Sequence, residues 1–121
     1  MRHQKVGRKF GRIRKVRVAL LKTMLGSLVM YERISTTEAK AKELKRLIDP
    51  IVNKAKRARS DEAIRVSLIR ELHASLPKMA AEKLNSDFSD RFASRESGYT
   101  RVVKLEARKS DAAKVAIIEF V

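Results

Sequence analysis

Residues 100–120, TRVVKLEARKSDAAKVAIIEF, decide the fold class, because here the hydrophobic pattern changes from a helical to a twofold period. In the first part the alternating apolar residues are Val103, Leu105 and Ala107. In the second part the apolar residues that share a face are Ala116, Ile118 and Phe120. Residues 109–113 read as a turn between two strands, and the stretch therefore predicts an antiparallel hairpin.

Helical periodicity dominates the chain before this hairpin. A mostly apolar helix is predicted from about Lys15 to Tyr31, buried on most sides, and Gly26 within it indicates close packing of another element. The stretch Ser35–Glu38 fits a capping box, with Thr36 as an alternative cap, and predicts a second helix that runs to about Arg59. Pro50 is expected to kink or split this second helix.

Two shorter helices and a third strand complete the expected fold. Ser60–Glu62 resembles another helix start, and Ser75–Pro77 ends that helix and opens one that runs to about Asn85. A short extended segment around Ile34 can add a strand to the hairpin. The predicted fold class is α+β, with several helices packed on a small sheet of about three strands and a basic N-terminal extension.

The net charge of +15 on 121 residues lies almost wholly in the first half of the chain. Residues 1–60 hold 18 basic and 4 acidic side chains, whereas residues 61–121 hold 11 and 10. Residues 1–17 contain eight basic side chains and no acid, so this segment repels itself and buries little apolar surface. We predict a basic arm at residues 1–14, ordered on RNA, and a single α+β domain at residues 15–121.

Such an excess of charge implies a polyanion partner, with nucleic acid the first choice and an anionic membrane the second. If each cation of residues 1–17 neutralised one phosphate, the arm would give a salt slope of roughly −6 to −7. No stretch approaches 18 apolar residues, and residues 1–17 contain no apolar h-region, so we expect no secretory signal. Cysteine is absent, which excludes disulfides and cysteine-based zinc sites.

Residues 90–101, DRFASRESGYTR, form a second basic segment, in and around a turn at Gly98. Arginine binds phosphate in a bidentate manner, and a tyrosine ring can stack on an unpaired base, so Tyr99 is a candidate for stacking. Phe88 and Phe92 are more typical of core residues. Together with the basic face of the second helix, the two segments give these candidate RNA-binding residues: Arg2, His3, Lys5, Arg8, Lys9, Arg12, Arg14, Lys15, Arg17, Lys40, Lys42, Arg46, Arg91, Arg95, Tyr99 and Arg101.

Candidates for catalysis are few. The sequence has no P-loop, dinucleotide-binding glycine pattern or zinc spacing, and of its two histidines His73 is expected at the surface. Asp87 and Asp90 are three residues apart and could share a metal, but capping and ion pairing with Arg91 is the favoured interpretation. We therefore predict no enzyme activity, no cofactor, no metal and no small-molecule substrate.

Several motifs, taken in order, resemble the bacterial family of large-subunit ribosomal protein seventeen. They are MRH at 1–3, GRK at 7–9, RVALL at 17–21, TT at 36–37, KAKEL at 40–44, RF at 91–92, GYTR at 98–101 and AIIEFV at 116–121. The resemblance covers nearly the whole chain. It implies an α+β structural constituent of the large ribosomal subunit, cytoplasmic in the ribosome and not an enzyme.

The same resemblance implies binding to large-subunit ribosomal RNA of the 23S type and support of its assembly. It also implies a position near the peptide exit region, contact with neighbouring proteins including ribosomal protein thirty-two, and no membrane partner. An architectural DNA-binding protein is the alternative that the charge permits, although no feature of the sequence selects a DNA groove. A metal-dependent RNA-processing enzyme that uses Asp87 or Asp90 is a third possibility.

Overall fold

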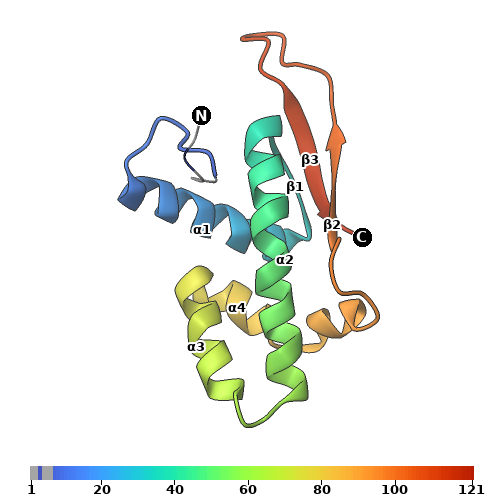
Figure 1. Cartoon of the computed structure of the whole chain (residues 1–121). Coiled ribbons are helices and arrows are strands. Elements are labelled where there is room, and N and C mark those ends of the chain that lie inside the picture. Colours follow the sequence, from blue (N-terminus) through green and yellow to red (C-terminus); the bar gives the residue numbers. More distant parts are fainter. Residues whose placement is uncertain (1–2, 4–6) are drawn as a thin grey trace.

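The computed structural model describes residue 3 and residues 7–121, so Arg2 and Lys5 of the predicted arm lie outside the described residues. A three-stranded sheet and the long helix α2 form the frame, and the other helices pack around them (Figure 1). The elements in chain order are α1 (Arg14–Tyr31), β1 (Arg33–Thr37), α2 (Glu38–Ser60), α3 (Arg65–Ser75), α4 (Lys78–Leu84), the 3-10 helix η1 (Asp87–Phe92), β2 (Thr100–Lys104) and β3 (Val115–Phe120).

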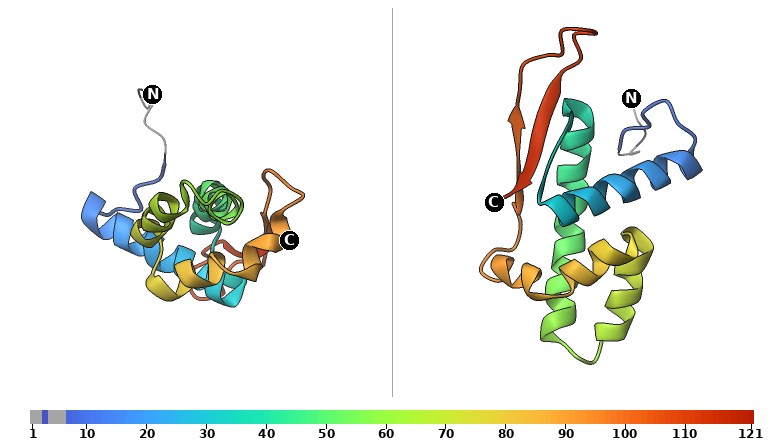
Figure 2. Two further views of the ribbon diagram at one scale, coloured as in Figure 1. Left: turned by 90° about the horizontal axis from the view of Figure 1, so that it is seen from below. Right: turned by 180° about the vertical axis from the view of Figure 1, so that it is seen from behind.

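The predicted hairpin is confirmed, and β3 is the central strand of an antiparallel sheet with the order β1–β3–β2. Ile118 is paired with Ile34 on one side and with Val102 on the other. Ala116, Ile118 and Phe120 are buried, as their alternation predicts. Helix α2 packs on this sheet, contacting all three strands, which confirms the α+β class (Figures 1 and 2).

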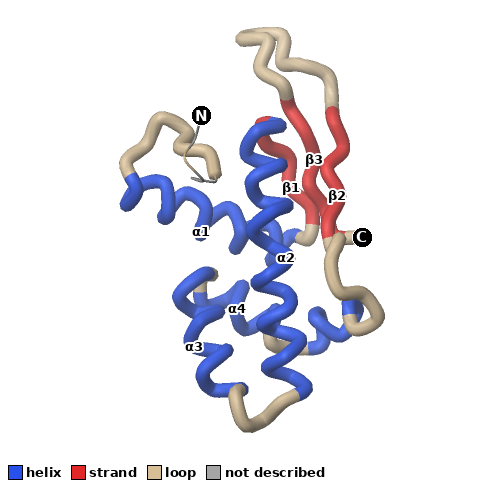
Figure 3. Tube along the Cα trace, in the orientation of Figure 1, coloured by secondary structure: helices blue, strands red, loops and turns tan. Residues whose placement is uncertain are grey.

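Strand β2 differs from its prediction in length and in the side that it buries. The strand ends at Lys104, and Val103 is exposed, whereas Thr100 is buried and Val102 packs against the core. The pairing with β3 explains the difference, since residues opposite each other in an antiparallel pair point to the same face. Val102 therefore shares the buried face of Ile118. The loop between β2 and β3 extends beyond the first turn of α2 (Figure 3).

Helix α2 contributes the largest share of the core, with one fully buried stripe made of Ala41, Leu44, Ile48, Val52 and Ala55. Pro50 lies inside the helix on an exposed position, and the helix continues from Glu38 to Ser60, so the predicted split is wrong. The predicted capping box is also wrong. Ser35 and Thr36 belong to β1 and pair with β3, and the backbone N–H of Glu38 is satisfied by the carbonyl of Lys114 instead, at 3.0 Å.

Helix α1 is buried over its second half only. Leu25, Leu28 and Val29 belong to the core, but Val18, which the periodicity assigns to the buried stripe, is 53% exposed. The first half extends away from the body of the molecule (Figure 2), and Val18 is left exposed there. The packing predicted at Gly26 is confirmed, because a Cβ atom there would lie 2.6 Å from Cγ of Pro77.

The end of the molecule opposite the hairpin loop holds α3, α4 and η1 (Figure 1). The helix start predicted at Ser60–Glu62 is displaced, since α2 includes Ser60 and α3 begins at Arg65. Asp61 instead accepts a hydrogen bond from the backbone N–H of Ala63, at 3.0 Å, in the turn between the helices. The aromatic rings of Phe88, Phe92, Tyr99 and Phe120 pack edge to face beneath the sheet, as expected for the two phenylalanines of η1.

Candidate nucleic-acid interface

Apart from Arg8, the cations of residues 7–13 and of the outer half of α1, residues 14–22, have no acidic partner in the described structure. No acidic residue precedes Glu32 in the sequence. Within the described part of the chain, no carboxylate oxygen lies within 4.0 Å of the following five side chains, which we call the N-terminal cluster: Lys9, Arg12, Arg14, Lys15 and Arg17. All but Arg17 are exposed, and His3 is also exposed, in a turn. The cluster is therefore a surface of uncompensated positive charge.

The start of α1 adds to this charge. The N-terminus of a helix carries a partial positive charge, which acidic side chains in the first turn normally offset. Helix α1 has Ile13 at its N-cap, no side-chain cap and no acid in its first turn, where Arg14, Lys15 and Arg17 lie. Three cations at the positive end of a helix repel the backbone dipole, and a bound anion would relieve that repulsion.

Apolar side chains interleave with these cations. Ile13 is 71% exposed and Val16 is 48% exposed, on the part of the chain that lies away from the core. Exposed apolar residues that cluster in this way are typical of a surface that a partner covers. The outer half of α1 therefore combines the charge and the uncovered area expected of an interface.

Arg8 connects this segment to α2. Its guanidinium lies 3.4 Å from Oε2 of Glu43, and Arg46 donates to Oε1 of the same carboxylate at 2.5 Å. Glu43 is only 4% exposed, which is unusual for a glutamate and requires the two cations as partners. Arg8 and Arg46, both predicted RNA-binding residues, thus share one buried carboxylate.

The first turn of α2 brings in further cations, including two that the sequence reasoning missed. Lys42 forms an ion pair with Glu38 at 2.8 Å, and Lys104 of β2 lies 3.7 Å from the same carboxylate. The hydrogen bond from Lys42, together with the charges of Lys42, Lys104 and Lys114, lowers the pKa of Glu38. The pairing of β3 with β1 and β2 brings Lys104 and Lys114 close to Glu38 of α2. No local pattern in the sequence indicates that these lysines lie there. Lys40 has no acidic partner among the described residues.

Arg8, Lys42 and Lys114 line one groove of about 350 Å³ at this end of α2. Its remaining lining residues are Thr37, Glu38, Ala39 and Ala113. The groove thus joins the N-terminal segment to the hairpin loop through the first turn of α2. Cations from three parts of the chain meet there.

The second predicted segment, Arg91–Arg101, differs because its arginines are engaged within the protein. Arg91 donates to Glu32, whose second oxygen accepts from Lys83 at 3.1 Å. These hydrogen bonds, that from Arg91 first, lower the pKa of Glu32. The guanidinium of Arg91 also lies over the rings of Phe88 and Phe92, 5.1 and 5.7 Å from their centres.

Arg95 and Arg101 follow the same pattern. Arg95 donates to a backbone oxygen of Val121 and lies over the ring of Phe92. Arg101 donates to Glu119 on the neighbouring strand at 2.7 Å, and this bond is the main cause that lowers the pKa of Glu119. Each arginine of this segment thus has a partner inside the fold.

Tyr99 corrects the expectation of a base-stacking ring, because its side chain is fully buried. Its ring packs edge to face on Phe92, with the ring centres 5.3 Å apart. Its hydroxyl donates to Asn53 at 2.5 Å and accepts from Lys56 at 3.0 Å. The ring has no exposed face on which a base could stack, and Tyr99 is a core residue with a satisfied hydroxyl.

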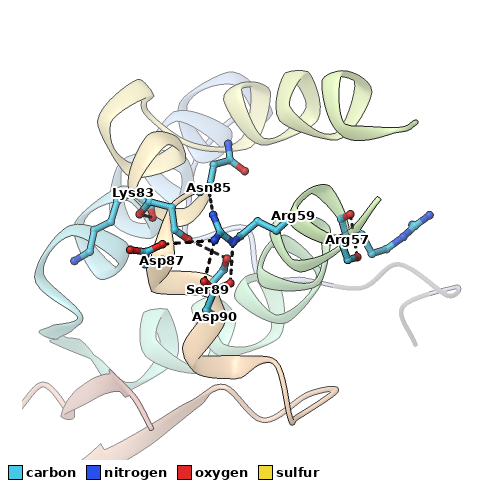
Figure 4. A network of polar contacts seen from close by, with 9 residues as sticks. Arg57, Arg59, Lys83, Asn85, Asp87, Ser89 and Asp90 are labelled. Carbon is cyan, nitrogen blue, oxygen red and sulfur yellow. Dashed lines mark hydrogen bonds and ion pairs between the residues drawn. The ribbon is translucent and has the colours of Figure 1, made fainter. Parts of the chain in front are cut away.

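Asp87 and Asp90 form ion pairs, as the favoured interpretation holds, although with a different arginine. Figure 4 shows Arg59 of α2 donating to both oxygens of Asp90, at 2.7 and 2.9 Å, with Asp87 at 3.5 Å. The hydrogen bond to Asp90 raises the pKa of Arg59. In the described parts of the chain no three histidine or acidic side chains come together as a metal site would need.

The charge distribution and this fold define a class, the small basic α+β proteins that carry a cationic surface at the N-terminal segment and the adjoining helix. None of the helices in the described residues has the length and apolar character to cross a bilayer. The comparison with known proteins makes the class specific. The family profile of Ribosomal protein L17 matches residues 20–121.

Three relatives, each called large ribosomal subunit protein bL17, align with the whole chain. The relative from Desulfosudis oleivorans is 43% identical, and the chain spans 56% of its length. The relative from Desulforapulum autotrophicum is 42% identical over 97% of its length, and that from Sorangium cellulosum is 36% identical over 83%. The chain belongs to the ribosomal protein L17 family, a bacterial family of structural, non-enzymatic components of the ribosome. This assignment confirms the resemblance found in the sequence and the prediction of no enzyme activity.

Proposed function

We propose that the chain binds large-subunit ribosomal RNA of the 23S type and supports the assembly of the subunit. The observation that carries the proposal is the N-terminal cluster, five cations without carboxylate partners on a segment that lies away from the core. The phosphates of an RNA backbone would neutralise these unpaired cations. Contacts with phosphates position a protein on RNA but do not read the base sequence.

The groove lined by Arg8, Lys42 and Lys114 is the second part of the proposed contact surface. It continues the charge of the N-terminal cluster onto α2, where Lys40 has no acidic partner among the described residues and Arg46 keeps free donors beside its bond to Glu43. An RNA backbone that follows the outer half of α1 could continue into this groove. The protein would then connect two stretches of RNA and hold them in a fixed relation, which is how it would support assembly.

Arg91, Arg95 and Arg101 have a lesser role in this proposal. Each has a partner within the fold, and none of the three lines the groove or belongs to the N-terminal cluster. We propose that these arginines keep the turn folded and add at most secondary contacts to RNA.

Two finer parts of the proposal rest on the family resemblance. They are the position near the peptide exit region and the contact with ribosomal protein thirty-two. Cross-linking and mass spectrometry of assembled large subunits would test both. Cross-links from this chain to protein thirty-two and to proteins around the exit are expected, and cross-links only to proteins elsewhere would contradict them.

The experiment that tests RNA binding is a truncation that spares α1. Because α1 begins at Arg14, removal of residues 1–13 leaves the helix in place and deletes five cations. The slope of log affinity for a large-subunit RNA fragment against log salt should become shallower by about 4. A slope equal to that of the whole chain would contradict the proposal.

Competition separates RNA from DNA as the partner. A large-subunit RNA fragment should displace the protein from duplex DNA of equal length at physiological salt. Preference for duplex DNA would support the architectural DNA-binding alternative instead.

A further inference from the structure

A pocket of about 400 Å³ lies where the N-terminal segment meets α1 and α2. Three parts of the chain contribute, and the lining residues are Gly7, Arg8, Lys9, Arg17, Leu21, Glu43, Arg46 and Leu47. Figure 1 shows the N-terminal segment beside the first half of α2, at the outer end of α1. The pocket thus exists only while the segment stays on α2.

Glu43 lines this pocket with a carboxylate that is almost fully buried. Its side chain is 5% exposed, and each oxygen has one arginine partner, Arg46 on Oε1 and Arg8 on Oε2. Removing one partner of a buried ion pair is costly, because an uncompensated charge is left behind. Glu43 therefore holds Arg8 in place, and Arg8 holds the N-terminal segment against α2.

Gly7 provides a second reason for this arrangement. Its φ of +104° is a conformation that residues with a side chain rarely adopt. A Cβ atom at this position would also lie 3.2 Å from Nη2 of Arg46 and 3.3 Å from Oε1 of Glu43. The backbone of the segment thus lies directly against the ion pair, and only glycine fits there without displacing it.

The charge inside the pocket is unbalanced. Among the described residues, four cations and one acid, Glu43, line it. Lys9 and Arg17 have no acidic partner in the part of the chain that the structure describes. Arg8 and Arg46 each contact Glu43 through a single nitrogen, so donors remain available on both guanidinium groups.

We propose that this pocket binds one phosphate group of an RNA backbone and that Glu43 is the positioning residue that closes the N-terminal segment around it. The inference rests on the proposed function and names the place where the RNA is held. An RNA backbone fits better than a protein carboxylate, because further cations adjoin the pocket, as the successive charges of a polyanion require. Arg12 and Arg14 follow the pocket residues in the chain and are exposed, and Lys42 lines the groove that shares Arg8 with the pocket.

The variant Glu43→Gln distinguishes the positioning of the N-terminal segment from a general electrostatic attraction to RNA. The substitution removes a negative charge, so attraction alone would strengthen RNA binding. If Glu43 positions the segment, affinity for a large-subunit RNA fragment should instead fall on the order of tenfold. Faster amide hydrogen exchange at residues 7–12 should accompany the loss. Unchanged or tighter binding by Glu43→Gln would overturn the proposal.

Other variants keep the test independent of folding. Gly7→Ala leaves the core untouched and should give the same loss of affinity and of exchange protection. Arg17→Met should make the salt slope of RNA binding shallower by about one. The control variant Arg57→Met, at the far end of α2, should keep the affinity for RNA within about twofold of the wild-type affinity. Equal effects of Arg17→Met and Arg57→Met would contradict a specific pocket.

Two probes distinguish an RNA phosphate from a free one. A short large-subunit RNA oligonucleotide should shift the amide resonances of Gly7 and Arg17 where inorganic phosphate, at the same phosphate concentration, does not. An equal response to both would identify a general anion site and overturn the assignment to RNA. If the wild-type chain does not bind the RNA fragment at all, the proposed function fails. If it binds but the variants behave as wild type, only the pocket fails.

Discussion

The N-terminal cluster and the Arg91–Arg101 turn are both rich in arginine, yet the structure uses the two segments differently. In the turn, Arg91 and Arg101 are bonded to Glu32 and Glu119, and the aromatic ring between them is in the core. In the N-terminal cluster, the described structure offers no carboxylate to any of the five cations. A basic segment thus indicates a partner only when the fold leaves its charges unmatched.

The largest expected effect concerns Tyr99. Tyr99→Ala should lower the free energy of unfolding by about 3–5 kcal/mol, because it removes a fully buried ring, as measured by urea denaturation. Tyr99→Phe should lower it by about 1–3 kcal/mol, because Lys56 and Asn53 lose their hydroxyl partner. Weakened RNA binding without a loss of stability would show that the turn resembles the N-terminal cluster after all.

The second effect concerns the N-terminal cluster, where we expect a change in RNA binding without a change in stability. The double variant Arg12→Met, Lys15→Met should make the salt slope of RNA binding shallower by about two, since two phosphate contacts are lost. The free energy of unfolding should stay within about 0.5 kcal/mol, because both side chains are exposed. A clear loss of stability would mean that these cations have structural partners like those in the turn.

The smallest effect is the pH dependence of the Arg91–Glu32 pair. Because hydrogen bonds from Arg91 and Lys83 lower the pKa of Glu32 in the folded chain, the pair stabilises the fold above the ordinary pKa of 4.5. That stabilisation is lost as the pH falls through the lowered pKa. At pH 6 the free energy of unfolding of the wild type, measured by urea denaturation, should exceed that of Arg91→Met by less than about 1 kcal/mol, because the pair is partly exposed. The difference should shrink towards pH 3.

Local patterns in the sequence predict the elements that depend on near neighbours. The alternation in Val115–Phe120 identifies the buried face of β3, and the stripe from Ala41 to Ala55 identifies that of α2. The glycine at position 26 indicates the close packing that Pro77 supplies. In the two stripes the periodicity carries the information, and at position 26 the residue type does.

The sequence does not show which charges find partners inside the fold. Glu32 lies 59 residues from Arg91, and Glu119 lies 18 residues from Arg101, so both pairs exist only after the chain has folded. The residues that flank Tyr99 in the sequence are typical of an RNA-binding turn. In the fold, however, its ring packs on Phe92 and its hydroxyl bonds to Asn53, so the side chain lies in the core. The buried Glu43 could not be predicted either, since a glutamate within KAKEL reads as an exposed helix residue.

The position of β3 in the sheet has a consequence for the order in which the chain folds. Among the described residues, both β1 and β2 pair only with β3, which follows the other elements in the chain. During synthesis the sheet cannot form until the residues of β3 have left the ribosome, whereas the cationic segment emerges before them. The segment proposed to bind RNA is therefore free to meet its partner before the body of the protein has folded.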